Sequence, residues 1–276
     1  MIFFFIYGYH IKKKKSMKYL EYKNKHERDE YLYFDEKKHE YTFYDTRSQP
    51  IIMYPAISST TLIHSLFPKF DSDRIIDNMM ASASWERNKY YPMTKQEIKD
   101  KWSENSREAM IKGTKLHEDI ESYLNFECIS NESIEFQYFL NFIRDNRINV
   151  YRTEWKIFDE ESGVAGTIDC ACIDQYGKIT LYDWKRAKEI KRTNDFKKQY
   201  SLKPYLKHLE DVNFNQYSLQ LNLYKYILEK NYKCVVKDMY LVVFHPENSN
   251  NNYKTVCVPD MSKEIKDIIQ EKINST

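Results

Sequence analysis

The sequence predicts a mixed α/β domain in which a central mixed β-sheet is flanked by helices, with a helical lobe at the N-terminus. Helical patterns come first along the chain, then strands, a helix, more strands and a closing helix. This order is typical of a mixed α/β domain. A chain of 276 residues is also long enough to bury a sizeable core as one domain, or as one domain with an appended lobe.

The N-terminal part is predicted to hold a small hairpin and three helices. Aromatic and polar residues alternate over 30–46 around a polar turn, which is a hairpin pattern. The helices are expected to end before Pro68, near residue 84 and at Trp102. Their expected N-terminal caps are Ser58 or Ser59, Asp71, and Thr94 with Glu97 as a capping box.

The remainder of the chain alternates helical and strand patterns. The expected elements are helices over 106–126 and 136–146, a strand over 152–158, a hairpin over 164–185, a helix over 214–230, strands over 236–244 and 253–258, and an amphipathic helix over 262–273. We therefore expect an N-terminal lobe over 17–105 and a core over 106–276.

Residues 1–16 are expected to be a separate extension. An apolar run there is too short to span a membrane, and it precedes the basic run Lys12–Lys15, the reverse of a secretory signal. Two interpretations stay open: a membrane-surface or targeting segment, or an upstream extension with initiation at Met17. The sequence contains no pattern for a membrane span.

Composition excludes several classes of protein. The formal net charge is only +2, so nucleic-acid binding would need a local basic patch. The five cysteines include no CxxC pair, and we expect no zinc or iron–sulfur site. Cys170 and Cys172 are predicted to be buried thiols. This pattern suits an intracellular, reducing compartment, and it does not distinguish cytoplasm, nucleus and mitochondrion.

The hairpin over 164–185 brings two acids together. If Asp174 and Lys178 close a three-residue loop, the residue numbers of cross-strand partners sum to 352, and Asp169 is opposite Asp183. Because strand side chains alternate, Lys185 shares the face of Asp183 and Trp184 points the other way. A loop one residue longer or shorter would place the acids on opposite faces.

Two opposed carboxylates beside a lysine suggest metal-assisted hydrolysis. The carboxylates repel each other unless a cation lies between them, and such oxygen ligands favour Mg²⁺ or Mn²⁺. Lys185 could hold the attacking water or neutralise a phosphate. By themselves, however, Asp and Lys at a strand end are more often solvated surface residues.

Two helices supply further candidates. Gly113, His117 and Glu121 line one face of the helix over 106–126. Neutral imidazole can bind Mn²⁺ or Mg²⁺, although a lone histidine is more often simply hydrogen-bonded. A glycine inside a helix is unfavourable, so we expect close packing at Gly113.

The second helix, over 214–230, carries the polar stripe Gln216, Gln220 and Tyr224. Gln220 could bond the substrate or the lysine, and Tyr224 could contact a phosphate or a base; the alternative is an exposed polar stripe. The basic segment 185–198, which includes Arg186 and Lys188, could follow a phosphate backbone, or it could be a solvated loop.

Taken in chain order, these motifs resemble one family. Five motifs follow one another in this order: Gly113-Thr114-x-x-His117-x-x-x-Glu121, Glu154, Gly166-x-x-Asp169, Asp183-Trp184-Lys185 and Gln220-x-x-x-Tyr224. Together they are similar to the pattern of the PD-(D/E)XK nuclease superfamily. The resemblance is to its RecB-like branch, and the motifs are most similar to those of the mitochondrial genome maintenance exonuclease type. It spans about residues 106–230.

The resemblance implies a restriction-endonuclease-like core and a Mg²⁺- or Mn²⁺-dependent deoxyribonuclease. An exonuclease acting on single-stranded or frayed DNA ends in repair, recombination or replication is the preferred form. The alternatives are a catalytically inactive binding module and an RNA-directed nuclease of the same fold. Some RecB-like nucleases hold an iron–sulfur cluster with four cysteines, and this chain lacks that arrangement. Protein partners are not predicted.

The resemblance also implies roles for individual residues. Metal ligands would be His117, Asp169, Asp183 and the main-chain carbonyl of Trp184. Lys185, Gln220 and Tyr224 would join the two aspartates as catalytic residues. Substrate contacts or second-shell positions would be taken by Glu121, Glu154, Arg186 and Lys188.

Overall fold

The computed structural model describes residues 17–45, 52–194 and 198–275. The predicted extension over 1–16 lies outside these residues. Within them, strands and helices form a mixed α/β arrangement around one central sheet, which is compatible with a restriction-endonuclease-like core. No helix in these ranges combines the length and the apolar character that a membrane span requires.

The sheet mixes parallel and antiparallel strands, as predicted. Seven strands follow one another across it in the order β1 (Leu32–Asp35), β2 (Glu40–Asp45), β3 (Ile52–Ser58), β5 (Val164–Ile173), β6 (Lys178–Lys185), β7 (Val235–Val243) and β8 (Lys254–Cys257), and β4 (Val150–Asp159) pairs with β5. The β3–β5 and β6–β7 pairs are parallel and the other neighbours are antiparallel.

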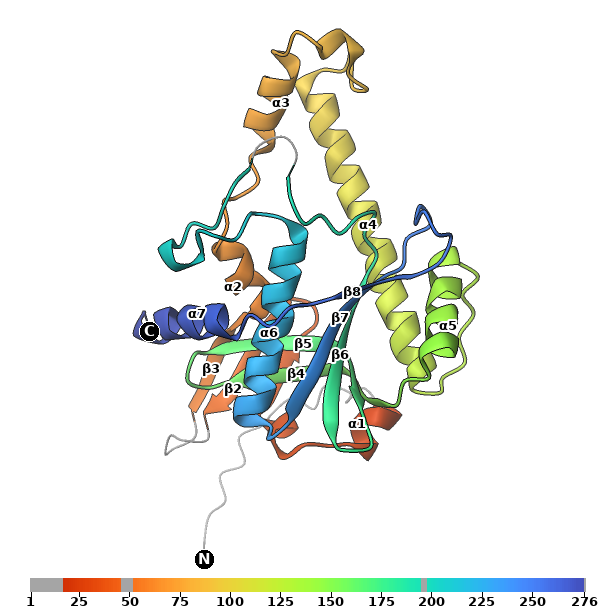
Figure 1. The fold of residues 1–276 in the computed structure, drawn as a ribbon, viewed down its shortest axis with the longest axis vertical. Coiled ribbons are helices and arrows are strands. Elements are labelled where there is room, and N and C mark those ends of the chain that lie inside the picture. The colour runs from red at the N-terminus through yellow and green to blue at the C-terminus, as the bar shows by residue number, and fades with distance from the viewer. Residues whose placement is uncertain (1–16, 46–51, 195–197, 276) are drawn as a thin grey trace, which may run out of the picture.

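Helices flank the sheet on both faces (Figure 1). They are α1 (Tyr19–Lys23), α2 (Ser59–Ser65), α3 (Ser72–Met80), α4 (Lys95–Leu124), α5 (Ile134–Asn146), α6 (Asn213–Asn231) and α7 (Ser262–Asn274), with 3₁₀ turns at Glu27–Tyr31, Trp85–Arg87 and Pro204–Leu206. The predicted caps are confirmed: Ser58, Asp71 and Thr94 each accept a hydrogen bond from a main-chain amide of the following helix.

One sequence-based prediction about these elements was wrong, and one strand was missed. The helices expected to end at Trp102 and to begin at residue 106 are one 30-residue helix, α4, because no Gly or Pro separates them and the Arg107–Glu104 ion pair (2.8 Å) spans the expected break. The predicted lobe boundary at 105/106 therefore lies inside α4. Strand β3 was not predicted, because it contains Pro55 and most of its residues are exposed.

An arm projects from the body of the molecule (Figure 1). We use this name for α3, the connection 81–94 and the first half of α4, residues 72–110. Ion pairs from Lys95 to Asp77 (2.8 Å) and from Lys99 to Asp73 (3.0 Å) tie α3 to α4. At the base of the arm, Trp102 lies between Phe70 and Tyr90.

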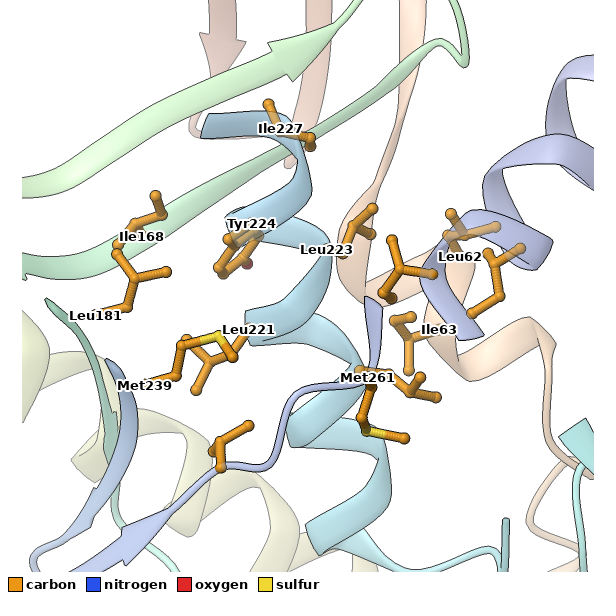
Figure 2. Close-up of a cluster of buried hydrophobic side chains, with 14 of the residues drawn as sticks. Leu62, Ile63, Ile168, Leu181, Leu221, Leu223, Tyr224, Ile227, Met239 and Met261 are labelled. Carbon is orange, nitrogen blue, oxygen red and sulfur yellow. The ribbon is translucent and has the colours of Figure 1, made fainter. Parts of the chain in front are cut away.

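Apolar clusters cover the two faces of the sheet. On one face, α2, α6 and α7 pack over strands β4 to β7, and Figure 2 shows side chains from α2, α6 and the sheet meeting there. On the other face, α4 and α5 pack over Cys170, Cys172 and Trp184. The prediction that both cysteines are buried thiols is confirmed.

Strand β5 is where the sheet divides. One edge of β5 pairs with β4 from Val164 to Cys172, so β3 and β6 share the other edge. On that edge β3 pairs with Val164 and Ala165, and β6 pairs with residues 170–173. Among the described residues, 166–169 have no strand partner on this edge, and the sheet forks there.

Candidate active site

The turn between β5 and β6 sets the register. The Asp174 carboxylate accepts hydrogen bonds from the amides of Tyr176 (2.8 Å) and Lys178 (2.9 Å), and Gly177 adopts φ 77°, a conformation that glycine accepts without strain. The pairs Cys170↔Tyr182 and Ile173↔Ile179 confirm the predicted sum of 352. The ladder ends at Cys170↔Tyr182, and Asp169 and Asp183 are the next residues beyond its end.

Asp169 lies at the fork, where the ladder between β5 and β6 ends. Its Oδ2 accepts a hydrogen bond from the main-chain amide of Trp184 (2.7 Å). The carbonyl oxygen of Trp184 in turn lies 2.9 Å from Nε2 of His117 on α4. These contacts join β5, β6 and α4 at one point.

Glu154 joins the same cluster from β4. Its neighbours Thr153 and Trp155 pair with Cys170 and Ile168, so Glu154 is opposite Asp169. It has φ 42°, a left-handed conformation that costs a non-glycine residue about 1 kcal/mol or more. Such local strain is common where side chains are positioned for function.

A cluster of three potential metal ligands results. Nδ1 of His117 lies 3.6 Å from Oδ2 of Asp169 and 3.8 Å from Oε1 of Glu154. One ligand atom from each residue lies within 4.8 Å of the other two. Because Nε2 contacts the Trp184 carbonyl, the nitrogen that faces the carboxylates is Nδ1.

The charges of this cluster shift its pKa values. Burial lowers the pKa of His117, but the negative charges of Asp169 and Glu154 outweigh burial and raise it to about 9. Burial raises the pKa of Asp169, the charge of His117 opposes this, and Glu154 adds to it. In the absence of a metal, the imidazolium is therefore the counter-ion of the two carboxylates.

Asp183 and Lys185 form a buried ion pair beside the cluster. Nζ of Lys185 lies 2.5 Å from Oδ2 of Asp183, and Trp184 points to the opposite face, as the alternation predicted. Burial raises the pKa of Asp183 to about 6; Lys185 opposes the shift and Asp169 adds to it. Apart from the ion pair, Oδ2 of Asp183 has no hydrogen-bond partner among the described residues.

Tyr217 is a site residue that sequence analysis missed. The Nζ atom of Lys185 lies over its ring, 4.4 Å from the centroid. Tyr217 precedes Gln220 by three residues and Tyr224 by seven, so all three lie on one face of α6. That spacing, rather than the stripe that includes Gln216, was the available signal.

Tyr224 and Gln220 form a polar layer against the fork. The hydroxyl of Tyr224 accepts hydrogen bonds from Nε2 of Gln220 (2.7 Å) and Oγ of Ser59 (3.0 Å), and Nε2 of Gln220 also donates to Oγ1 of Thr60 (3.2 Å). A Cβ on Gly166 would lie 2.5 Å from the Tyr224 ring. Glycine is therefore required where this ring packs on β5.

The other predicted residues lie further away. Gln216 bonds Asp211 (2.7 Å), Arg186 bonds Glu135 (2.8 Å), and the exposed Lys188 pairs with Glu247. Glu121 lies one helical turn beyond His117 and is half-buried. The expectation of close packing at Gly113 was wrong, because an added Cβ would meet nothing within 4 Å.

The donor atoms fit a hard divalent cation. Carboxylate oxygens are the preferred ligands of Mg²⁺ and Mn²⁺, and imidazole suits Mn²⁺. The cluster supplies two carboxylates and one imidazole, and the buried carboxylate of Asp183 lies beside it. A cation here would replace the His117 proton as the counter-charge.

Comparisons with known proteins give distant structural likenesses. No protein-family model and no curated protein matches the sequence. The crystal structure of SSO0001 matches with a TM-score of 0.35 and 15% identity, over 80% of this chain and 76% of that chain. The alkaline exonuclease LHK-Exo from Laribacter hongkongensis matches with a TM-score of 0.29 and 11% identity, over 78% and 88%.

Proposed function

We propose that this protein is a Mg²⁺- or Mn²⁺-dependent DNA nuclease of the PD-(D/E)XK type. The observation that carries the proposal is the cluster of His117, Glu154 and Asp169 directly beside the buried Asp183–Lys185 pair. Metal-ligand side chains next to a buried lysine are the components needed to cleave a phosphodiester.

The proposed roles are of two kinds: some residues would bind the metal ion, and others would position the water and the substrate. His117, Asp169 and Glu154 would hold the metal, with Asp183 and the Trp184 carbonyl beside them. A bound Mg²⁺ or Mn²⁺ would polarise the phosphodiester and lower the pKa of the attacking water. Lys185 would donate hydrogen bonds to that water or to a phosphate oxygen. Gln220 would contact the substrate, and the buried Tyr224 would hold Gln220 in place through its hydroxyl.

Two features support the role of Lys185. Burial lowers its pKa, but the charges of Asp183 and Asp169 outweigh burial and raise it, so the ammonium stays charged. Asp183 and the ring of Tyr217 both contact the ammonium. A group fixed in this way contributes to catalysis without first being reorganised.

We propose single-stranded or frayed DNA ends as the substrate, cleaved by an exonuclease of the RecB-like branch acting in repair, recombination or replication inside the cell. This finer assignment follows the sequence resemblance, most of all to the mitochondrial genome maintenance exonuclease type. The motifs that carry it, from His117 to Tyr224, lie around one fork in the sheet.

The test compares the parent with Asp169→Asn and Asp183→Asn on labelled single-stranded DNA, duplex DNA and RNA with Mg²⁺, Mn²⁺ or Ca²⁺. Asp238→Asn, on the adjacent strand β7 and 38% exposed, is the matched control. We expect the parent and the control to degrade DNA with Mg²⁺ or Mn²⁺, and both site variants to lose at least about 100-fold in rate.

Other outcomes would revise the assignment. Equal degradation by all four proteins would contradict the proposed site. Metal-independent DNA binding without any degradation would indicate a binding module, and degradation of RNA alone would change the substrate class. Substrates blocked at the 5′ or the 3′ end would establish the polarity of an exonuclease.

A further inference from the structure

A cavity of about 950 Å³ lies between α2, α3 and the start of α6. Its walls come from the end of α2, the segment 67–71, α3, the start of α6, and Asn194, Gln199 and Asp211 in the connection before α6. Ligand cavities in proteins range from about 300 to 1,000 Å³, so this cavity is large enough for a nucleoside. None of the residues assigned to the chemistry above lines it.

The cavity begins one helical turn from the polar layer of Gln220 and Tyr224. On α2, His64 follows Thr60 by four residues, and on α6, Gln216 precedes Gln220 by four. Residues four apart lie on the same face of a helix, about one 5.4 Å turn from each other. Since Gln220 bonds Thr60 across the two helices, His64 and Gln216 form the next layer, one helical turn from that contact.

The cavity has a polar wall in this layer. Nε2 of Gln216 donates to the carboxylate of Asp211 (2.7 Å), which leaves the amide oxygen of Gln216 and one amide hydrogen for another partner. His64 is exposed and adds a ring nitrogen. Amide and imidazole groups match the donors and acceptors on the edges of nucleobases.

Two aromatic residues also line the cavity. Phe67 is buried, whereas Phe70 is 73% exposed. The ring of Phe70 contacts Trp102, with centroids 6.0 Å apart, and that contact holds it at the base of the arm. Exposed aromatic rings in nucleic-acid-binding proteins serve as stacking surfaces for bases. Arg74 also lines the cavity and is about half exposed; its Nε lies 3.6 Å from Oδ2 of Asp71, and the rest of its guanidinium can contact a phosphate.

We propose that this cavity binds the base of one unpaired nucleotide in single-stranded DNA, next to the phosphodiester held at the candidate site. The base stacks on Phe70, and its polar edge faces His64 and Gln216. This inference rests on the proposed nuclease function and extends it by naming a base-binding subsite. A base in a duplex is paired and stacked, so the subsite selects unpaired strands.

The experiment uses the full chain and fluorescent 2-aminopurine, whose emission falls when it stacks on an aromatic ring. The probes are 2-aminopurine deoxyribonucleoside monophosphate and oligonucleotides with one 2-aminopurine at successive positions, in Ca²⁺ to limit cleavage. The variants are Phe70→Ala, Phe70→Trp and His64→Ala. Phe126→Ala is the control, because Phe126 is also exposed (79%) and also makes an aromatic contact, with Tyr19 at 5.3 Å.

We expect quenching at one or two adjacent positions in the parent and in Phe126→Ala. Loss of one stacking surface should weaken binding about 5- to 100-fold in Phe70→Ala, and Phe70→Trp should restore it. Equal quenching and affinity in Phe70→Ala, Phe126→Ala and the parent would overturn the proposal, as would equal quenching at every position of the strand.

A parallel cleavage assay separates the two proposals. In one outcome, the parent cleaves DNA in a metal-dependent way while Phe70→Ala changes neither quenching nor affinity. That result would contradict the base-binding subsite and support the nuclease function. Quenching that depends on Phe70, without cleavage in the presence of any of the metals, would support the base-binding subsite and contradict the nuclease function. Thermal melting of each variant checks folding.

Discussion

The carboxylate of Asp169 accepts a hydrogen bond from the main-chain amide of Trp184 at the point where β6 separates from β5. A side chain thus replaces a bond of the sheet ladder. The separation opens the edge of β5 at residues 166–169, and the Tyr224 ring packs against Gly166 there.

Substitution by alanine should have opposite effects on stability at Gly166, in strand β5, and at Gly113, in helix α4. In Gly166→Ala the new Cβ would lie 2.5 Å from the Tyr224 ring and 2.7 Å from Oγ of Ser59, so we expect about 1–3 kcal/mol of destabilisation. Gly113→Ala meets nothing within 4 Å and should stabilise α4 by about 0.5–1 kcal/mol. Urea denaturation measures both changes, and equal effects would contradict the packing.

The ring of Tyr217 should matter for turnover through Lys185. Contact between an ammonium and an aromatic face is worth about 0.5–2 kcal/mol, so Tyr217→Leu should lower kcat by about 2- to 30-fold. Tyr217→Phe keeps the ring and should stay within about twofold of the parent. Steady-state cleavage assays compare the two, and a larger loss in Tyr217→Phe would show that the hydroxyl is the group that matters.

Mn²⁺ should stabilise the folded protein through the three-residue cluster. A ligand at 100 times its dissociation constant stabilises the state that binds it by about 2.7 kcal/mol. We expect Mn²⁺ to raise the Tm of the parent and much less that of Glu154→Gln, whose carboxylate is replaced by a weaker ligand. Glu161→Gln, in an exposed turn after β4, is the control; an unchanged Mn²⁺ shift in Glu154→Gln would place the ion elsewhere.

Asp159 should make the fold sensitive to acid. Burial raises its pKa, but hydrogen bonds from Asn231, Lys230 and Ser162 outweigh burial and lower it below the ordinary 3.8. A lowered pKa contributes stability that is present above the unfolded value and is lost as pH falls through the folded value. Asp159→Asn should therefore be less stable by about 1–3 kcal/mol at pH 7, and the difference should shrink below pH 4. Urea titrations at pH 7 and pH 3 measure it.

The central part of the site could be predicted because its determinants are local. Asp174 and Gly177 specify a three-residue turn, and that turn fixes the register of every residue in the hairpin. Strand alternation then places Lys185 with Asp183 and Trp184 in the opposite core. These inferences need no knowledge of distant segments.

The remaining features depend on tertiary contacts. The left-handed backbone conformation of Glu154 could not be predicted from the sequence. In this conformation, the Glu154 carboxylate lies beside His117. Ser59 reaches Tyr224 only because β3 joins the sheet beside β5, and β3 itself lacks an apolar alternation. The glycine at position 113, inside a helix, predicted close packing, but no neighbouring element packs closely there.

The continuity of α4 links two parts of the molecule that a break near residue 105 would have separated. The same helix carries Trp102, which contacts Phe70 at the base of the arm, and His117, which contacts Trp184. Trp102 and His117 are fifteen residues apart, which corresponds to about 22 Å along the helix axis. If α4 moves as one body, a tilt at Trp102 on binding of a DNA strand would also shift the His117 imidazole, and substrate binding would then be coupled to the geometry of the proposed metal ligands.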